Sequence, residues 1–490
     1  MRAVTWVPMG LAAGLLAGCM VGPDYHRPDA PVAATFSEAP GPSSAAAGGW
    51  RPADPKDQTL RAEWWKLFGD PTLDALEAQV DTGNQTLKQA EANFRVARAA
   101  VRFQRSNLLP TIGAAPSGGV ERVSANEPYF SRAAANNGVN DFSAPLDLNY
   151  EVDLWGRVRR SVNSARDSAQ AAAADTENVR LALHAELAGD YFNLRAAIAT
   201  QQLLDATVKA YEDALRLTQD RYNGGASPLS DVAQARTQLE TARVQAADIG
   251  VARGAYAHAI AVLAGKPPGT LPSGIDSLVK QAPQLPGIPG LLPSELLERR
   301  PDIASAERQM AAANEQIGIA KAAYYPALTL SGDVGYMSTA ISSWFEWPSR
   351  FWAVGGTLSE TLFDNGRRRA TSEIAQANYD NTVAGYRQSV LSAVQEVEDN
   401  LVAMRELEVE AARQHAATEA AEQTLQLFQT RYEGGVDTYL QVITWQTAAL
   451  QNERNDIDLL QRRLQATVLL VKALGGGWSD RQLPSVASLP

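Results

Sequence analysis

The feature that most constrains the fold is a regular seam of apolar and small residues that continues for about 65 residues without a proline. The seam begins at Val158 and ends at Tyr222, and its members are spaced alternately three and four residues apart. This spacing predicts one long packed helix, which at about 1.5 Å per residue is about 100 Å long. Charged residues occur in nearly every turn, so this helix does not cross a lipid bilayer.

Shorter helices are predicted on either side of this rod. One follows Pro228 and has about 37 residues, and another occupies about 86–109. Placed end to end, these two helices match the length of the long one. The second half repeats the arrangement, with helices predicted at 303–325, 367–432 and 438–474. The seam is rich in alanine rather than leucine, which favours close side-by-side packing of several helices; a long two-stranded coiled coil is the alternative.

Short motifs recur in the same order in both halves. The sequence RYNGGASPLSDV from Arg221 corresponds to RYEGGVDTYLQV from Arg431, an offset of 210 residues. Likewise, SNLLPTIGAAPSGG corresponds to AAYYPALTLSGDVG, and DLWGRVRR corresponds to LFDNGRRR. Between the halves, residues 265–293 contain seven prolines and five glycines, which predicts an extended linker. The chain is therefore an internal duplication.

Between each short helix and the following long helix, the hydrophobic pattern changes to period two. Residues 142–154 alternate between apolar and mostly acidic side chains, and 110–123, 327–336 and 351–363 are further candidate strands. Aromatic residues gather near the strand ends: Tyr129, Phe130, Tyr336, Trp344, Phe345, Trp347, Phe351 and Trp352. This pattern is typical of outer-membrane β-barrels, with a small soluble sheet as the alternative. Four strands are too few to close a membrane barrel, so chains must pool them, about eight in a dimer or twelve in a trimer.

The N-terminus has the pattern of a targeting segment. Arg2 precedes an apolar stretch at 3–17, which ends in the sequence LAGC with Cys19 as the only cysteine. This predicts a secretory signal peptide at 1–18, because the stretch is too short to span a membrane. An ordinary signal peptide with a chance cysteine is the alternative. LAGC resembles the bacterial lipoprotein box, which implies a lipid on Cys19 and a Gram-negative envelope protein; Met20 lacks the aspartate that typically retains lipoproteins at the inner membrane.

Composition and motifs exclude several classes of function. The chain has 44 Lys and Arg against 55 Asp and Glu, and its net charge of −11 argues against nucleic-acid binding. One cysteine and four scattered histidines leave little material for a metal site or a disulfide. No GxSxG or HExxH motif occurs, so we expect no enzyme. We expect no metal and no cofactor other than the covalent lipid on Cys19.

The lipoprotein box, the duplicated strand-and-helix pattern and the motifs DLWGRVRR and RRPDI together resemble the TolC-type outer-membrane efflux factors, in their NodT-like or OprM-like lipoprotein branch. The resemblance covers Cys19 to about Gly476. It implies a homotrimer with a 12-stranded barrel in the outer membrane and a 12-helix periplasmic tunnel. It also implies a periplasmic membrane-fusion adaptor and an inner-membrane pump, commonly of the resistance–nodulation–division class. The implied mechanism is passive conduction through a gated, lipid-anchored exit duct of a tripartite efflux system, with a type I-like export system as the alternative.

The resemblance also assigns roles near the two RYxGG motifs, which lie where each long helix turns into its partner. It implies adaptor contact at these turns, although paired glycines also suit any tight helix–helix turn; the residues are Gly224, Gly225, Ala226, Gly434, Gly435 and Val436. The implied periplasmic gate consists of Asp231, Leu440, Gln441 and Thr444. Because Gln441 and Thr444 lack the acidic side chain common in the family, we expect Leu440 to contribute a hydrophobic constriction. Candidate gate latches are Arg221, Tyr222, Arg431 and Tyr432, which are equally compatible with solvated arginines beside core tyrosines.

The predicted fold class is therefore an α+β membrane protein, in which a shared outer-membrane β-barrel continues into a long periplasmic α-helical barrel. The predicted division has a signal peptide at 1–18, a lipid-anchored extended segment at 19–60, a first repeat at 61–264, an equatorial linker at 265–293, a second repeat at 294–475 and a flexible tail at 476–490. The acidic strand face predicts a lumen that mildly favours cations.

Overall fold

The computed structural model describes residues 20–33, 35–38, 63–122, 124, 126, 138–270, 296–485 and 488–489. The predicted signal peptide, Cys19 and most of the predicted linker lie outside these residues. The helices are η2 (Trp64–Phe68), α2 (Pro71–Gly83), α3 (Gln85–Ser106), α5 (Arg157–Asn223), α6 (Leu229–Leu263), α7 (Leu296–Arg299), α8 (Pro301–Ala322), η5 (Ile341–Ser343), η6 (Trp347–Ser349), α9 (Arg367–Glu433), α10 (Tyr439–Ala473) and η7 (Asp480–Gln482). The strands are β1 (Thr111–Ala114), β2 (Ser117–Glu121), β3 (Val139–Val152), β4 (Ala327–Ser338) and β5 (Arg350–Ser359).

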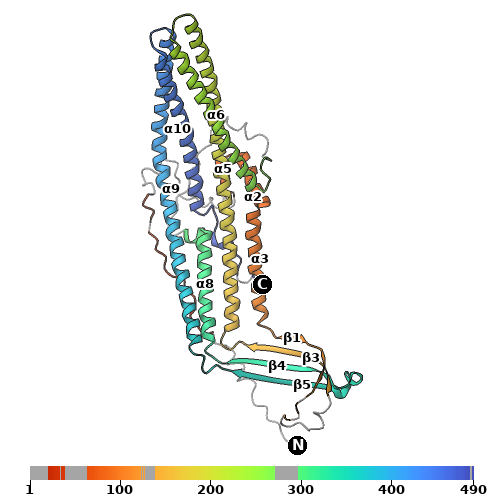
Figure 1. Cartoon of the computed structure of the whole chain (residues 1–490). Helices are drawn as coiled ribbons and strands as arrows, with labels where there is room; N and C mark the ends of the chain where they lie inside the picture. The colour runs from red at the N-terminus through yellow and green to blue at the C-terminus, as the bar shows by residue number, and fades with distance from the viewer. Residues whose placement is uncertain are drawn as a thin grey trace.

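The two halves contain helices of equal length. Helices α5 and α9 each have 67 residues, α6 and α10 each have 35, and α3 and α8 each have 22. The long helices run almost the whole length of the molecule, with the sheet at one end and the hairpin turns at the other (Figure 1). The predicted duplication and the predicted long helices are thus confirmed. None of the described helices combines the length and the apolar character needed for a membrane span.

The shorter helices meet end to end beside the long ones, as their lengths predict. In the first half, the Asn84 side-chain amide at the start of α3 donates to the carbonyl of Leu263 at the end of α6, over 2.9 Å. In the second half, Arg300 before α8 donates to the carbonyl of Ala473 at the end of α10, over 3.0 Å. Arg300 belongs to the RRPDI motif and also pairs with Glu396 of α9. The motif therefore joins three helices at this level.

The main hydrophobic core surrounds these junctions. It contains buried aromatic residues from η2, α5 and α9, among them Trp64, Trp65, Tyr191, Phe192 and Tyr386. Helix α2 packs into the same core through its apolar face. The sequence pattern does not predict α2, because this helix has only 13 residues and its amphipathic pattern is too short to stand out. The core thus fastens the short helices to the two long ones.

The strands form one antiparallel sheet with four strand positions. β1 and β2 both pair with β3 in a single continuous register, from Thr111 opposite Asn149 to Glu121 opposite Val139. The first predicted strand is therefore present but divided, because Pro116 between its two pieces has no amide hydrogen for the ladder. β3, β4 and β5 follow in order. The fourth predicted strand, at 351–363, is corrected to Arg350–Ser359.

The sheet has one apolar and one polar face. Residues opposite each other in an antiparallel pair share a face, so the register assigns Leu148, Val334 and Trp352 to one side and Asp147 and Asp333, which are direct partners, to the other. The apolar side is uncovered in the single chain: Ile112, Val120, Trp352, Val354 and Leu358 are each at least 66% exposed. The predicted alternation is confirmed, and such a face requires lipid or another chain to cover it.

Each DLWG-type motif makes the turn from a strand into a long helix. Asp153 accepts hydrogen bonds from the amides of Val158 and Arg159 at the start of α5, and Gly156 has a φ of 80°. Asp364 and Gly366 repeat this geometry before α9, where Asp364 accepts from the amides of Gly366 and Arg368. Each carboxylate thus accepts from free amides at the positive end of a long helix, which stabilises the helix start directly after the sheet.

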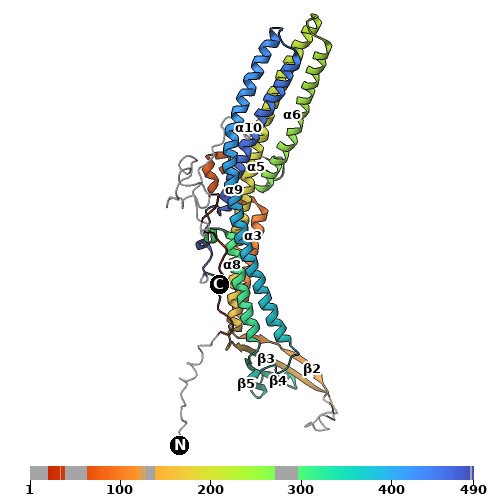
Figure 2. The ribbon, with the colours of Figure 1, turned by 90° about the vertical axis from the view of Figure 1, so that its left-hand side faces the viewer.

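The first described residues run along the helices in an extended conformation. The amide of Val21 donates to the Trp155 carbonyl beside the sheet, and Arg160 of α5 donates to the carbonyl of Val21 over 2.7 Å. Farther along, the hydroxyl of Tyr25 donates to Glu307 of α8, and Ser37 donates to Glu398 of α9. The segment thus ties α5, α8 and α9 together (Figure 2).

The predicted flexible tail is instead packed in its described residues. Trp478 is 6% exposed and contacts Ala174 and Ala304, and Leu489 is 2% exposed and packs against Val101. Trp478 packs against α5 and α8, and Leu489 packs against α3 and α5, contacts that a composition-based prediction does not detect.

Candidate functional site

The two hairpin turns are built alike. In the first, the amide of Ala226 donates to the carbonyl of Arg221 and the amide of Gly225 donates to the carbonyl of Tyr222; the second repeats both bonds. This is a Schellman arrangement, which requires a left-handed residue after the helix. Gly225 and Gly435 have that conformation, with φ of 71° and 72°. Gly224 has a helical φ of −82°, so the second glycine of each pair is the one the turn requires.

One arginine connects the two hairpins at the tip. Arg221, at the end of α5, donates over 2.7 Å to the main-chain carbonyl of Tyr432 at the end of α9. Its guanidinium also lies 4.5 Å from the centre of the Tyr432 ring. Tyr432 is buried against Tyr439 and Val442, in a small core that Ala235 of α6 joins. Arg221 and Tyr432 therefore form a contact between the hairpins of one chain.

The other two latch candidates do not cross between the hairpins of the described chain. Arg431 pairs with Asp437 in its own turn, and Tyr222 is 39% exposed. The cause is visible in the motif, because the position of Asp437 in the second repeat is Ser227 in the first. A serine does not hold an arginine as an aspartate does, so Arg221 reaches the other hairpin while Arg431 is retained locally. The prediction of four equivalent latch residues did not use this difference between the repeats.

The predicted gate residues lie on the first turns of α6 and α10, directly after the two hairpin turns. Asp231 is half-buried at the start of α6, whereas Leu440, Gln441 and Thr444 are exposed at the start of α10. Leu440 is 55% exposed although it is strongly apolar, and Thr444 donates its hydroxyl to the carbonyl of Leu440 over 2.9 Å. The three α10 residues and the hairpin turns are therefore exposed at the tip of the single chain. Their roles stay predictions.

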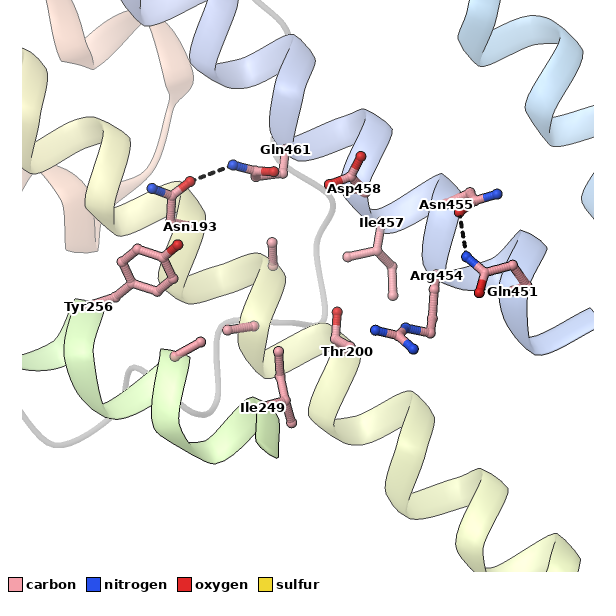
Figure 3. A pocket seen from close by; sticks show the side chains of 13 residues that line it. Asn193, Thr200, Ile249, Tyr256, Gln451, Arg454, Asn455, Ile457, Asp458 and Gln461 are labelled. Atoms are coloured by element: carbon pink, nitrogen blue, oxygen red, sulfur yellow. Dashed lines mark hydrogen bonds between the residues drawn. The ribbon is translucent and has the colours of Figure 1, made fainter. Parts of the chain in front are cut away.

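Further polar contacts join the hairpins below the tip. Gln238 of α6 donates to Thr447 of α10 over 2.9 Å, and Gln461 of α10 donates to Asn193 of α5 over 2.5 Å. Between these contacts lies a cavity of about 380 Å³, which α5, α6 and α10 surround (Figure 3). Arg454 and Tyr256 extend toward it from opposite helices. The sequence analysis does not predict these polar contacts between helices, because it predicts the helices from the spacing of their apolar residues only.

A buried charge cluster fastens α2 to α5. The His184 Nδ1 atom lies 2.6 Å from Glu77 Oε2, its Nε2 atom lies 3.5 Å from Asp81, and Trp65 stacks on its ring. Burial lowers the pKa of His184, but hydrogen bonds to Asp81 and Glu77 outweigh it and raise this pKa to about 9. Burial also raises the pKa of Glu77 to about 7. Across the described ranges, no group of three or more His, Cys, Asp or Glu side chains is arranged to hold a metal ion.

The geometry described so far combines a two-faced sheet with duplicated helical hairpins and a linked tip. A family model described as "Outer membrane efflux protein" matches residues 78–265 and 292–476. The chain belongs to the outer membrane efflux protein family. This confirms the family that the motifs indicate.

Relatives and solved structures agree with this assignment over almost the whole chain. Outer membrane protein OprJ of Pseudomonas aeruginosa is 32% identical over 480 residues, which cover 96% of this chain and 95% of OprJ. Toluene efflux pump outer membrane protein TtgC of Pseudomonas putida is 31% identical over 476 residues, 96% of each chain. The solved structure of the outer-membrane channel OprN has a TM-score of 0.86 and 28% identity, and the match covers 94% of this chain and 100% of that one.

The family assignment supports the predictions on fold and function. Members of the outer membrane efflux protein family are trimeric outer-membrane channels that work with adaptors and inner-membrane pumps, not enzymes. The predicted α+β channel fold and the predicted exit-duct function are therefore confirmed. The class of pump, the lipid on Cys19 and the roles of individual residues are finer statements and stay proposals.

Proposed function

We propose that three copies of this efflux protein form one gated exit duct that conducts small molecules passively from a periplasmic adaptor to the outside. The observation that carries the proposal is the two-faced sheet. Among the described strands, the outer edges of β1, β2 and β5 pair with no other strand, and one face is apolar and uncovered. In lipid, both deficits are met when four strands from each of three chains close into a ring of twelve.

The gate in this proposal lies at the hairpin tips. The Arg221–Tyr432 latch holds the hairpins of each chain together, and the exposed Leu440 of three chains meets on the axis as a hydrophobic constriction. Asp231, Gln441 and Thr444 line the same level. Opening is a rearrangement of packed hairpins between two arrangements rather than a deformation of the sheet.

The adaptor in this proposal contacts the two hairpin turns, and the pump behind it belongs to the resistance–nodulation–division class. The turns support this because their side chains are exposed; Val436, for example, is 69% exposed. Two relatives are named as outer-membrane proteins of toluene efflux pumps, which supports small-molecule export. Copurification of the chain with a candidate adaptor, and its loss when Val436 is replaced by Asp, tests this contact.

A lipid on Cys19 anchors each chain in this proposal. The support is the start of the described chain, because Met20 lies against Gly156 and Val21 bonds to Trp155 at the strand-to-helix turn. That turn is the end of the helical part nearest to the membrane. Mass spectrometry of the mature N-terminal peptide tests the anchor: acyl chains on Cys19 are expected, and an unmodified cysteine overturns it.

Electrical recording tests the duct itself. Purified protein in planar bilayers is expected to give discrete channels, and Leu440→Ala is expected to raise their conductance, because a smaller side chain widens the constriction. Leu469→Ala, an exposed leucine near the far end of the same helix, is the matched control. Trimers that are electrically silent in both forms would refute the exit duct, whereas normal channels with no effect of Leu440→Ala would remove only Leu440 from the gate.

A further inference from the structure

The cavity between α5, α6 and α10 lies where side chains of the second hairpin reach across to the first. Arg454 of α10 donates over 3.4 Å to the side-chain oxygen of Gln245 on α6. Two turns farther along α10, Gln461 donates to Asn193 of α5. The walls of the cavity therefore belong to both hairpins, so its shape depends on how the two hairpins are arranged.

Small side chains leave this space open. Helix α5 contributes Ala196 and Ala197 to the lining, and α6 contributes Ala252. Each of these side chains ends at its Cβ atom, so the three positions do not fill the gap between the helices. The resulting volume of about 380 Å³ falls in the range of about 300–1,000 Å³ that small-molecule sites occupy.

Part of the lining is apolar. Ile249 of α6 and Ile457 of α10 point into the same space, and the Tyr256 ring extends from α6 toward Asn193 (Figure 3). All three apolar or aromatic side chains are half-buried. An apolar molecule of suitable size would therefore remove their remaining surface from water.

One cation reaches into the cavity without a carboxylate partner. Arg454 is half-buried and extends from α10 toward Thr200 of α5 (Figure 3). Within the described part of the chain, it bonds only to the neutral Gln245, and no carboxylate lies within ion-pair distance. Asp458, one turn farther along α10, also lines the cavity but is exposed. A partly desolvated guanidinium without a counter-charge favours an anionic ligand.

We propose that this cavity binds an organic monocarboxylate with an apolar ring body, and that the bound molecule holds the two hairpins in the arrangement described here. The carboxylate accepts paired hydrogen bonds from the Arg454 guanidinium, and the Thr200 hydroxyl donates to the same group. The ring body fills the space between Ile249 and Ile457. A ligand that fits walls from both hairpins stabilises this arrangement over one in which the hairpins have moved. Binding does not depend on conduction, whereas the effect on gating rests on the proposed duct.

Calorimetric titration of purified trimers in detergent tests the site. The probe is naphthoate, and naphthamide is its uncharged isostere. Arg454→Gln is expected to weaken naphthoate binding by at least about tenfold, because a charge-assisted hydrogen bond is lost, and to change naphthamide binding little. The matched control is Arg462→Gln, which is expected to bind like the wild type, because Arg462 pairs with Glu410 and neither residue lines the cavity.

A second variant tests the site without removing a polar group. Ala252→Leu fills the apolar part of the cavity, so it is expected to abolish binding of both probes. Ala255→Leu is its control, because Ala255 is exposed on the same helix and does not line the cavity. Naphthoate binding that survives unchanged in both Arg454→Gln and Ala252→Leu would overturn the site.

Single-channel recording in planar bilayers tests the effect on the hairpins. Naphthoate is expected to lower the open fraction of wild-type channels several-fold and to leave Arg454→Gln channels unchanged, a difference that direct block of the pore would not produce. An open fraction that stays the same although naphthoate binds would overturn the coupling. Trimers that bind naphthoate through Arg454 but never conduct would refute the proposed duct and leave the site standing. Conducting trimers that bind no naphthoate would refute the site alone.

Discussion

Replacing Arg221 by Gln should unlatch the hairpin tips. The substitution removes the charged donor 2.7 Å from the Tyr432 carbonyl and the cation 4.5 Å from the Tyr432 ring. A hydrogen bond with a charged partner contributes about 1.5–3 kcal/mol and an exposed cation–π contact about 0.5–1 kcal/mol. Arg221 is only half-buried, so we take the low end, about 2 kcal/mol per chain, which corresponds to a factor of about 30 in the closed-to-open ratio. Concerted opening of three chains multiplies this to a change on the order of ten-thousand-fold.

The assay is the fraction of time that single channels stay open in planar bilayers at low voltage. Arg431→Gln is the matched control, because it removes the same charge from the equivalent position but breaks only the pair with Asp437 inside one turn. We expect long-lived open channels for Arg221→Gln and wild-type gating for Arg431→Gln, with trimers intact in both. If the two variants have the same open fraction, whether both are high or both are like the wild type, the reasoning is refuted that Arg221 and not Arg431 links the two hairpins.

The second glycine of each turn should be the sensitive one: Gly435→Ala is expected to lower the melting temperature, at a cost of about 1 kcal/mol for a left-handed side chain, while Gly434→Ala at φ −71° is tolerated. Equal melting of the two variants contradicts this. Thermal stability should fall as pH rises from 6.5 to about 9, because the raised pKa of His184 means that folding stabilises its protonated form, which is lost over this pH range. His184→Gln should flatten the plot of melting temperature against pH. A wild-type melting temperature that rises over this range would contradict a stabilising role for the His184 charge. Asp147→Asn combined with Asp333→Asn should weaken cation preference in reversal-potential measurements, since the two carboxylates are direct partners on the polar face; unchanged selectivity would place them off the conduction path.

The helices and the faces of the sheet could be predicted from the sequence because each depends on a local periodicity. The seam from Val158 to Tyr222 predicts which side of α5 is buried, and the alternation in β3 predicts which side of the sheet is apolar. What escaped prediction depends on contacts between distant elements. The His184–Glu77 pair joins residues 107 positions apart, and no local pattern relates them.

The latch illustrates the same limit more sharply. Arg221 and Arg431 occupy equivalent positions in two nearly identical motifs, so periodicity alone gives them the same role. Only the side chain six residues later, Ser227 or Asp437, decides which arginine is retained in its own turn and which reaches the other hairpin. A position-by-position comparison of the two repeats exposes this difference, whereas matching each repeat to a family pattern conceals it.

The divided helical columns have a mechanical consequence. α6 and α10 end where α3 and α8 begin, whereas α5 and α9 pass this level unbroken. A bend at this level strains the side-chain hydrogen bonds of Asn84 and Arg300 at the junctions. It breaks no backbone hydrogen bonds inside the shorter helices, because each of them ends at the junction. Each 35-residue helix above the joint is a lever about 50 Å long, so a tilt of about 10° moves its far end by about 9 Å. With α5 and α9 bending along with their packed partners α6 and α10, the periplasmic entrance can thus travel several ångströms while the ring held in the bilayer stays still.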